Sequence, residues 1–236
     1  MKHLVAIALG LLVAGCATAP APAPMPVMIK GPLQGQLKDG VYRDRAAWFE
    51  VSAPVLPTDP NYTAMGLDEE YPEHVSYVSF IPSRSPGEFY HAYVEDFFAS
   101  DHPVPSMDQV ADSAMKVFGT PMVKQRTEPL HLVEERYWRT STTTGLLRLY
   151  TERTPSEMLM QNLGMAEDYT AYILMYVTAQ KGKVAVLWAE WPVGCSVCAP
   201  LVPGPATAST DPIDQALAAN GRSKPFMDSF RFHTAD

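Results

Sequence analysis

The stretch YTAYILMYVTAQKGKVAVLWAEW, residues 169–191, decides the fold because it has the pattern of two strands joined by a tight turn. On each side of Lys181-Gly182, apolar side chains occupy both sets of alternating positions. Strands that are apolar on both faces are typical of the middle of a sheet that is covered on two sides. The sequence therefore predicts a central β-hairpin whose turn lies at 180–183.

A second hairpin is predicted immediately before the first. Residues 134–140 and 146–152 have strand character, and Thr143-Thr144-Gly145 supplies the turn between them. The more exposed side chains of this hairpin are expected to be Arg136, Arg139, Arg148 and Tyr150. We expect the arginines to pair across the strands with acidic residues such as Glu134 and Glu152. A surface that binds an anionic ligand is the alternative interpretation of the same arginines.

The N-terminal part of the domain predicts shorter strands and a long loop. Val41-Tyr42 and residues 48–51 are expected to form a small hairpin, and residues 75–81 a further strand. Prolines between them predict a loop over 54–73. This loop carries an acidic cluster, Asp68, Glu69, Glu70 and Glu73. The cluster lacks the regular ligand spacing of a calcium loop, which favours a solvated loop over a Ca²⁺ site.

Three helices are predicted from the residues of their first turns. Ser85-Pro86-Gly87-Glu88 has the pattern of a capping box with proline at the first helical position, which predicts a helix over 86–99. Ser106 and Gln109 predict a second helix over 107–118, and Thr154-Pro155-Ser156-Glu157 a short third one that ends at Gly164. With a helical segment near the C-terminus, the chain predicts an α+β fold in which helices cover an antiparallel sheet of about six or seven strands.

Two short phrases suggest a fold family. Residues 39–44, Asp-Gly-Val-Tyr-Arg-Asp, are followed by Trp48-Phe49-Glu50-Val51, and Met227-Asp228-Ser229-Phe230-Arg231 lies near the C-terminus. In these phrases and in the order of its elements, the domain resembles the PsbP/Mog1-like folds. The resemblance implies an accessory or binding module more than an enzyme, although a shared fold does not determine function.

The N-terminus predicts export and a lipid anchor. Residues 4–14 contain no polar side chain and follow Lys2 and His3, a run that is too short to span a bilayer but fits a secretory signal. The next residues, Val13-Ala14-Gly15-Cys16, resemble the lipobox of bacterial lipoproteins. This resemblance implies cleavage between Gly15 and Cys16, a diacylglyceryl group on the Cys16 thiol and an acyl chain such as palmitate on the new N-terminus. An ordinary secretory signal, cut after Ala17 or Ala19, is the alternative.

The lipoprotein resemblance also predicts location and domain organisation. Because Ala17 rather than aspartate follows the cysteine, the resemblance favours the outer membrane over the inner membrane, with the domain facing the periplasm. We expect a signal peptide at 1–15, the lipidated cysteine with a Pro/Ala-rich linker at 16–34, and a single globular domain at 35–236. An extended linker of this composition spans ~3.1 Å per residue, so its first sixteen residues reach about 50 Å from the bilayer.

Composition and motifs narrow the range of functions. A hydrophobic fraction of 47% supports a packed core, and a net charge of −8 disfavours nucleic acid as a partner. The sequence lacks the usual hydrolase, zinc-protease, phosphate-loop and dinucleotide motifs, so we expect neither a catalytic residue nor a cofactor. The histidines lack metal-ligand spacing and are expected at the surface or at caps: His74, His91, His102, His131 and His233.

The remaining candidate site is the pair Cys195 and Cys198. A C-x-x-C pair at the start of a helix is typical of redox proteins, but the prolines of 199–205 disfavour a helix here. Export favours an oxidised pair, so we expect a small structural disulfide. Two functions follow: a non-catalytic envelope module that binds another envelope protein, a cell-wall component or a ligand, or alternatively a periplasmic thiol-redox factor or enzyme that uses Cys195 and Cys198.

Overall fold

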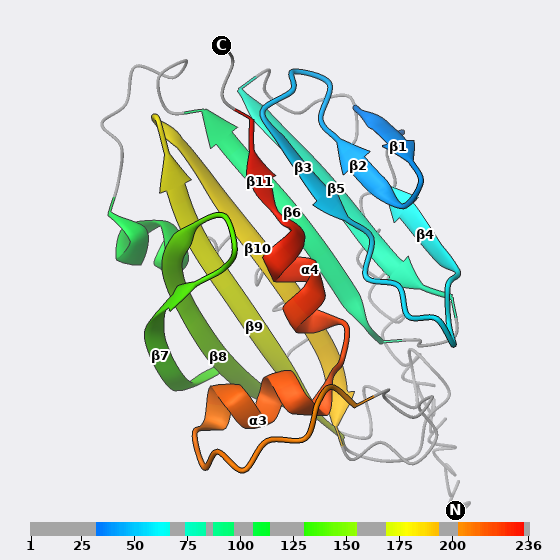
Figure 1. The fold of residues 1–236 in the computed structure, drawn as a ribbon. Helices are drawn as coiled ribbons and strands as arrows, with labels where there is room; N and C mark the ends of the chain where they lie inside the picture. Colours follow the sequence, from blue (N-terminus) through cyan, green and yellow to red (C-terminus); the bar gives the residue numbers. More distant parts are fainter. Residues whose placement is uncertain are drawn as a thin grey trace, which may run out of the picture.

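The computed structural model describes residues 32–66, 74–83, 87–96, 106–113, 130–154, 169–193 and 203–233. These residues form mostly antiparallel sheet with a few helices (Figure 1), as the sequence predicts. The large sheet has seven strands in the order β4-β5-β6-β10-β9-β8-β7, and a smaller sheet has the order β1-β2-β3-β11.

The central hairpin is confirmed. β9 (Tyr169–Gln180) and β10 (Lys183–Val193) pair in antiparallel register from Gln180 and Lys183 at the turn to Thr170 and Val193 at the far end. Lys181 and Gly182 form the turn with φ angles of 49° and 76°. Positive φ at both turn residues matches the right-handed twist of the two strands, which is why this sequence closes so tightly.

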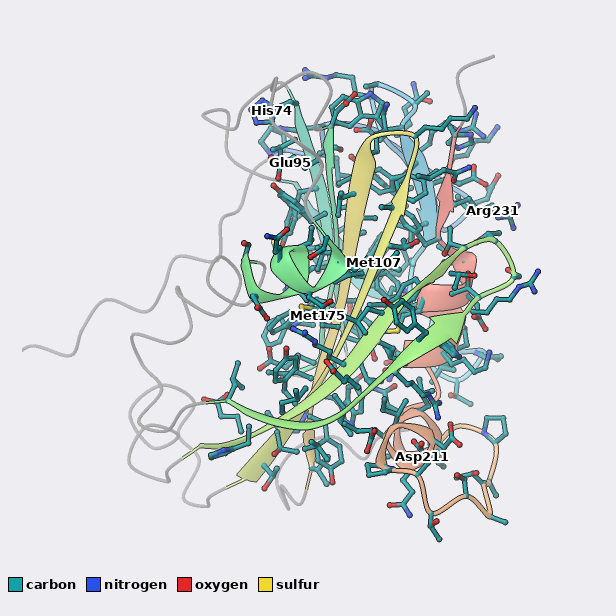
Figure 2. The ribbon with its side chains drawn as sticks, turned by 90° about the vertical axis from the view of Figure 1, so that its left-hand side faces the viewer. His74, Glu95, Met107, Met175, Asp211 and Arg231 are labelled. Atoms are coloured by element: carbon teal, nitrogen blue, oxygen red, sulfur yellow. The ribbon has the colours of Figure 1, made fainter. Side chains whose placement is uncertain are left out.

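Both faces of the large sheet are covered where β9 and β10 lie. One face, here called the α4 face, packs against α3 (Pro212–Ala219) and α4 (Ser223–Ser229); its strand residues include Leu174, Tyr176, Leu187 and Trp191. The other, here called the Met107 face, packs against a helix at 107–113; its strand residues include Ile173, Met175, Val186 and Trp188. Figure 2 shows Met107 and Asp211, at the start of α3, on opposite sides of the strands.

The two strands of the second hairpin are also confirmed, and they form one end of the large sheet. The turn lies at 140–143 rather than at 143–145, because Thr144 and Gly145 already pair with Arg139 and Trp138. β8 (Thr144–Thr154) pairs with β9 on one side and with β7 (His131–Arg139) on the other. The pairing of β7 with β8 is regular from Glu134 to Arg139, and a bulge interrupts it between Leu132 and Glu134. β7 is therefore an edge strand.

Several shorter elements lie where the sequence predicts them. β2 (Val41–Arg43) pairs with β3 (Phe49–Ser52), and β5 (Val75–Pro82) is the strand predicted over 75–81. Two further strands complete the small sheet, β1 (Gln36–Lys38) and β11 (Arg231–Phe232). The C-terminal helical segment consists of α3 and α4, and the Asp211 carboxylate caps α3 by accepting from the backbone N–H groups of Ile213 and Asp214.

The helix predicted over 86–99 is wrong, because residues 89–96 form strand β6 (Phe89–Asp96). β6 pairs with β5 on one side and with β10 on the other. Its apolar spacing fits a helix, but it also fits a strand buried on both faces, with Tyr90 and Ala92 on the α4 face and His91 on the opposite one. Pairing on both sides outweighs a local capping pattern. Residues 84–86 and 97–99 lie outside the described part of the chain.

The long loop predicted over 54–73 is also partly wrong. Residues 62–65 form strand β4 (Tyr62–Met65), which pairs with β5 at the other edge of the large sheet. Alternating Tyr62 and Ala64 pack against the α4-face core, which accounts for the strand despite the nearby prolines. The acidic cluster from Asp68 to Glu73 lies outside the described residues.

The second predicted helix begins as expected. Ser106 and Gln109 cap each other reciprocally: the Gln109 amide oxygen accepts from the Ser106 backbone N–H at 2.9 Å, and the Ser106 hydroxyl accepts from the Gln109 N–H at 3.3 Å. The helix is described over 107–113, and its predicted remainder lies outside the described residues. So do residues 155–164 of the third predicted helix, while Thr154 is the last residue of β8.

Candidate functional site

The cysteine sites predicted from the sequence lie outside the part of the chain that the structure describes. This holds for the cleavage and lipidation site at Gly15 and Cys16 and for the expected disulfide between Cys195 and Cys198. His102 lies outside it too. The described residues do contain the arginine-bearing hairpin β7–β8, a buried histidine and a buried ion-pair network. These three regions are the candidates for a functional site.

Arg148 is buried, contrary to the exposure predicted for it and for its neighbour Tyr150. Its guanidinium group binds Asp112 at 2.7 Å, Asp108 at 3.0 Å and Glu135 at 3.0 Å. The helix at 107–113 supplies the two aspartates and packs over the strand, which explains the burial. Burial disfavours the charge of Arg148, but hydrogen bonds with Asp112, Tyr150 and Glu135 raise its pKa above the usual range, so it stays protonated.

Arg136 joins the edge of the sheet to the cap of α3. Its guanidinium group binds Asp211 at 3.1 Å and Asp214 at 2.5 Å. The hydrogen bond from Arg136 lowers the pKa of Asp214. The expected cross-strand pairing occurs for Arg148, but with its direct neighbour Glu135 on β7. The other carboxylates that bind Arg148 and Arg136 come from the helix at 107–113 and from α3 with its cap, which are distant in sequence. Two of the three arginines proposed for anion binding are already neutralised by acidic partners.

An exposed apolar strip lies along the edge strand β7. Among the described residues, the large apolar side chains with high exposed fractions are Tyr137 (69%), Leu132 (49%), Val133 (42%) and Val55 (41%). The first three belong to β7, and we call them the β7 edge patch. Leu132 pairs with Tyr150 and Tyr137 with Leu146, residues that pack into the Met107-face core, so Leu132 and Tyr137 lie on that face.

Three partly exposed carboxylates lie on the same face of the sheet as Leu132 and Tyr137. Glu135 lies on the same strand with 48% of its side chain exposed. Asp108 and Asp112 lie on the adjacent helix and are 61% and 68% exposed. All three contact the single buried guanidinium group of Arg148, so the rim of the patch has more negative than positive charge. Exposed apolar side chains with a polar rim are typical of interaction surfaces.

His91 is buried, which corrects the expectation that it lies at the surface. Its Nδ1 lies 2.6 Å from the Tyr77 hydroxyl, and its ring stacks with those of Tyr77 and Phe89. Burial lowers the pKa of His91 to about 4, so the imidazole is neutral near pH 7. Its position between β5 and β10 suits packing.

The other described histidines pair with acids or are exposed. His74 lies 4.0 Å from Glu95 and His233 lies 3.2 Å from Glu50, while His131 is exposed at the start of β7. No group of three or more histidine, cysteine, aspartate or glutamate side chains that could hold a metal ion occurs among the described residues.

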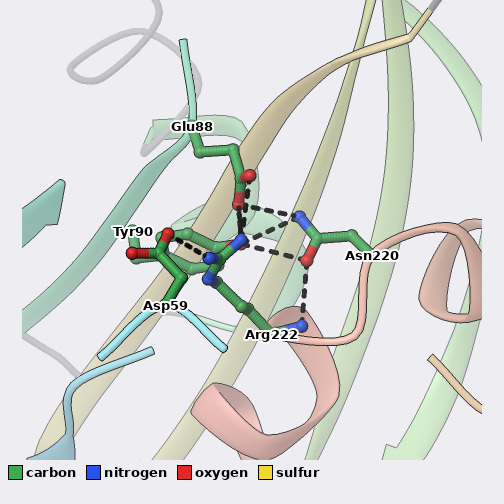
Figure 3. A network of polar contacts seen from close by, with 5 residues as sticks. All are labelled: Asp59, Glu88, Tyr90, Asn220 and Arg222. Atoms are coloured by element: carbon green, nitrogen blue, oxygen red, sulfur yellow. Dashed lines mark hydrogen bonds and ion pairs between the residues drawn. The ribbon is translucent and has the colours of Figure 1, made fainter. Parts of the chain in front are cut away.

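A buried ion-pair network lies on the α4 face (Figure 3). Arg222 binds Asp59 at 2.6 Å and Glu88 at 3.1 Å, and all three side chains are at most 7% exposed. The Tyr90 hydroxyl donates to Glu88 at 2.7 Å and accepts from the Asn220 amide at 2.8 Å. Burial and the neighbouring Glu88 raise the pKa of Tyr90 well above its usual value, which keeps it a donor.

This network is structural, since it ties the corner between α3 and α4 to β6 and to the segment before β4. No local sequence pattern predicts this network. The capping pattern predicts that Glu88 caps a helix together with Ser85, but Glu88 binds the guanidinium group of Arg222, 134 residues later in the chain. Nothing in the local sequence of Arg222 distinguishes it from a surface arginine.

The described part of the chain contains no helix that is both long and apolar enough to cross a membrane.

No family model and no curated protein match the sequence. Solved structures do resemble it. The solution structure of cyanobacterial PsbP from Synechocystis matches with a TM-score of 0.47 and 14% identity, over 82% of this chain and 91% of that one. The Ran-binding protein Mog1p of Saccharomyces cerevisiae matches with a TM-score of 0.40 and 10% identity, over 83% and 96%. A protein of Bacteroides thetaiotaomicron matches with a TM-score of 0.39 and 11% identity, over 86% of this chain and 50% of that one. The chain thus weakly resembles the PsbP and Mog1 folds.

Proposed function

We propose that the chain is an exported lipoprotein, anchored through acyl chains on Cys16 in the outer membrane, and that its periplasmic domain is a non-catalytic module that binds another envelope protein. The observation that carries the binding role is the β7 edge patch. Leu132, Val133 and Tyr137 are all exposed on one edge strand, and carboxylates of the adjacent helix flank them.

The arrangement of the patch favours a binding role over chance exposure. A single exposed apolar residue such as Val55 is ordinary in a soluble domain and requires no explanation. The three exposed apolar residues of the patch all lie on β7, the last strand of the large sheet, next to the backbone groups of its outer edge. A partner that covers this edge gains hydrophobic burial and backbone hydrogen bonds together. Anchoring adds to this, because a protein held at a membrane meets membrane-bound partners at high local concentration.

Several buried titratable groups serve packing, which supports a module over an enzyme. Arg222 and Glu88 hold the helical corner, Arg148 holds the helix at 107–113, and Arg136 holds α3. His91 is held neutral beneath aromatic rings. Each of these groups has a structural role that accounts for its position.

The anchoring half of the proposal is tested by the substitution Cys16→Ser in the full precursor. We expect the altered protein to lose fatty-acid labelling and to leave the membrane pellet, because two or three acyl chains are what make the attachment stable. Cys195→Ser is the matched control, and it should stay acylated and membrane-bound. A Cys16→Ser protein that is still trimmed, labelled and pelleted contradicts the anchor.

The binding half is tested by co-purification of the acylated full-length chain from detergent-solubilised envelopes. We expect a stoichiometric envelope protein to be lost when Tyr137, the most exposed residue of the patch, is changed to serine. Val55→Ser removes a comparably exposed apolar side chain outside the patch and should retain the partner. Equal recovery of the partner with both variants would show that the patch does not bind it.

A further inference from the structure

We infer that the β7 edge patch binds an extended, positively charged segment of a partner protein, which adds to the large sheet as a strand beside β7. The inference rests on the proposed function, since it specifies the chemistry of the partner at the same patch. Three features of the described residues carry it: the end of the strand order, the alternation of side chains along β7, and the excess of negative charge around that strand.

The end of the strand order gives the segment its place. β7 pairs with β8 on one side and is the last strand in the order of the large sheet. Its register is regular from Glu134 to Arg139, which is six residues, and the bulge before Glu134 ends regular pairing. An incoming strand of about six residues, roughly 20 Å long, matches this length. Bulges commonly limit how far an edge strand can be extended.

The alternation of side chains along β7 determines on which face of the sheet an incoming segment finds exposed side chains to contact. Trp138 and Arg136 point to the α4 face, where Trp138 packs edge-on against Tyr176 and Arg136 binds the cap of α3. Glu135 and Tyr137 point to the Met107 face and are largely exposed. On the Met107 face, a segment beside β7 therefore meets the exposed ring of Tyr137 and the carboxylate of Glu135, which is 48% exposed although it contacts Arg148. On the other face it meets Trp138 and Arg136, which already have partners within the protein.

The charge around β7 selects a basic segment. The described residues place six carboxylates near this strand: Asp108, Asp112, Glu134, Glu135, Asp211 and Asp214. Three guanidinium groups oppose them, those of Arg136, Arg139 and Arg148. The ammonium group of Lys224 also lies near β7, 5.5 Å from the centre of the Trp138 ring, but its own ion pair with Asp228 leaves the excess unchanged. Lysine or arginine side chains of a partner gain from this excess, and acidic ones are repelled.

The same charge disfavours a second copy of this chain as the occupant. An antiparallel pairing of β7 with its own copy brings two edges of the same negative excess together. Pairing centred on Glu135 would place that carboxylate directly opposite its equivalent, and like charges directly opposite each other destabilise a sheet. A basic segment of a different protein would neutralise the excess negative charge and would also form hydrogen bonds with the outer backbone groups of β7.

The experiment uses the full-length acylated chain in detergent and fluorescent hexapeptides. We expect the alternating Lys-Val peptide to bind at least about tenfold more tightly than the alternating Glu-Val peptide, and to weaken about tenfold when salt is raised from 50 mM to 500 mM. A Lys-Val peptide with N-methyl groups on all its backbone nitrogens keeps its charge but has no backbone donor on either edge, so it should bind at least tenfold more weakly. Tyr137→Ser and Glu135→Gln should each weaken Lys-Val binding several-fold, and Val55→Ser should leave it unchanged.

Each contrary result overturns a defined part of the inference. Equal binding of the Lys-Val and Glu-Val peptides overturns the charge preference, and equal binding of the N-methylated peptide overturns strand addition. A dimer in sedimentation that Tyr137→Ser dissociates assigns the patch to a second copy. If no peptide binds while Tyr137→Ser still releases the co-purified envelope protein, the inference fails and the proposed function stands. If Lys-Val binds but the co-purified protein does not depend on Tyr137, the proposed function fails instead.

Discussion

Arg222 and Arg148 make the same kind of contact on opposite faces of the large sheet, yet in very different surroundings. Each guanidinium group is at most 9% exposed and gathers carboxylates from other elements. The carboxylates that bind Arg222, Asp59 and Glu88, are as buried as the arginine itself. Those that bind Arg148 are between 48% and 68% exposed.

The difference teaches what each network contributes. A carboxylate that has lost its water depends on its cation, so the loss of Arg222 would leave two uncompensated charges inside the protein. A carboxylate that keeps most of its water can do without the cation. The network on the α4 face therefore holds the fold together, while the network on the Met107 face shapes the charge of a surface beside the β7 edge patch.

The largest effect is expected for Arg222→Met, which keeps an unbranched chain at this position and removes the charge. Glu88 and Asp59 would then be buried without their partner, at a cost of about 3–5 kcal/mol of unfolding free energy. Urea unfolding followed by circular dichroism measures this loss. Lys224→Met, which breaks an exposed ion pair on α4, is the control and should cost at most ~0.5 kcal/mol. A loss of less than about 1 kcal/mol for Arg222→Met would contradict the comparison.

A smaller effect is expected from His91, which extends the comparison to a buried group that is held neutral. Its pKa is about 4 in the fold and ~6.5 in an unfolded chain, so the unfolded state binds more protons between these values. Stability is complete above pH ~6.5 and falls as the pH is lowered towards about 4, by at most about 3 kcal/mol.

The His91 prediction is measured by unfolding the protein at several pH values. His91→Gln keeps a polar side chain beside Tyr77 but cannot be protonated, so its stability should vary less over the same window. His131→Gln, at an exposed position on β7, is the matched control and should keep the dependence of the unaltered protein. If the curves for the His91 variant and the unaltered protein run parallel, His91 does not carry the effect.

A still smaller loss is expected for Arg148→Met, about 1–2 kcal/mol, because its three carboxylates return to water. Unfolding in 50 mM and 500 mM salt separates this variant from Arg222→Met. High salt screens the repulsion that remains among Asp108, Asp112 and Glu135, so part of the loss should be recovered. No such recovery is expected for the buried network of Arg222. A loss as large as that of Arg222→Met would remove the distinction between the two networks.

Local patterns predicted the parts of the fold in which they and the long-range packing agree. The hairpin around Lys181-Gly182 and the cap formed by Ser106 and Gln109 depend on neighbours in sequence, and both are confirmed. The prediction for the segment from Phe89 to Asp96 is wrong because its local pattern and its long-range packing disagree. Its spacing suits a helix or a strand buried on both faces, and pairing with β5 and β10 decides for the strand. Both strands are predictable, but the local pattern of 89–96 does not show that this segment lies between them.

The sequence predicts the strands of the candidate site but not the elements that pack against them, because those contacts join residues that are distant in sequence. The alternation of the sequence predicts the hairpin that carries Arg136, Arg139 and Arg148. Apart from Glu135, however, the carboxylates that bind Arg136 and Arg148 come from residues 107–113 and from α3 with its cap. A sequence shows which strand an arginine lies on, not which helix will cover it. The exposure of Tyr137 on an edge strand depends equally on the strand order, which alternation alone does not give.

The smallest effect is expected for Asp112→Asn, which is best compared with the same aspartate-to-asparagine change at Asp59 in the other network. Asp112→Asn removes a charge that is 68% exposed and leaves Arg148 with Asp108 and Glu135, so the loss should be at most ~0.5 kcal/mol. Asp59→Asn removes the charge of a buried carboxylate that pairs with Arg222, and it should lower the unfolding free energy several times more, by about 2–3 kcal/mol. The two changes are chemically identical, so the ratio of their unfolding free energies isolates the effect of burial. Equal losses would mean that the exposure of the carboxylate does not decide the strength of these ion pairs.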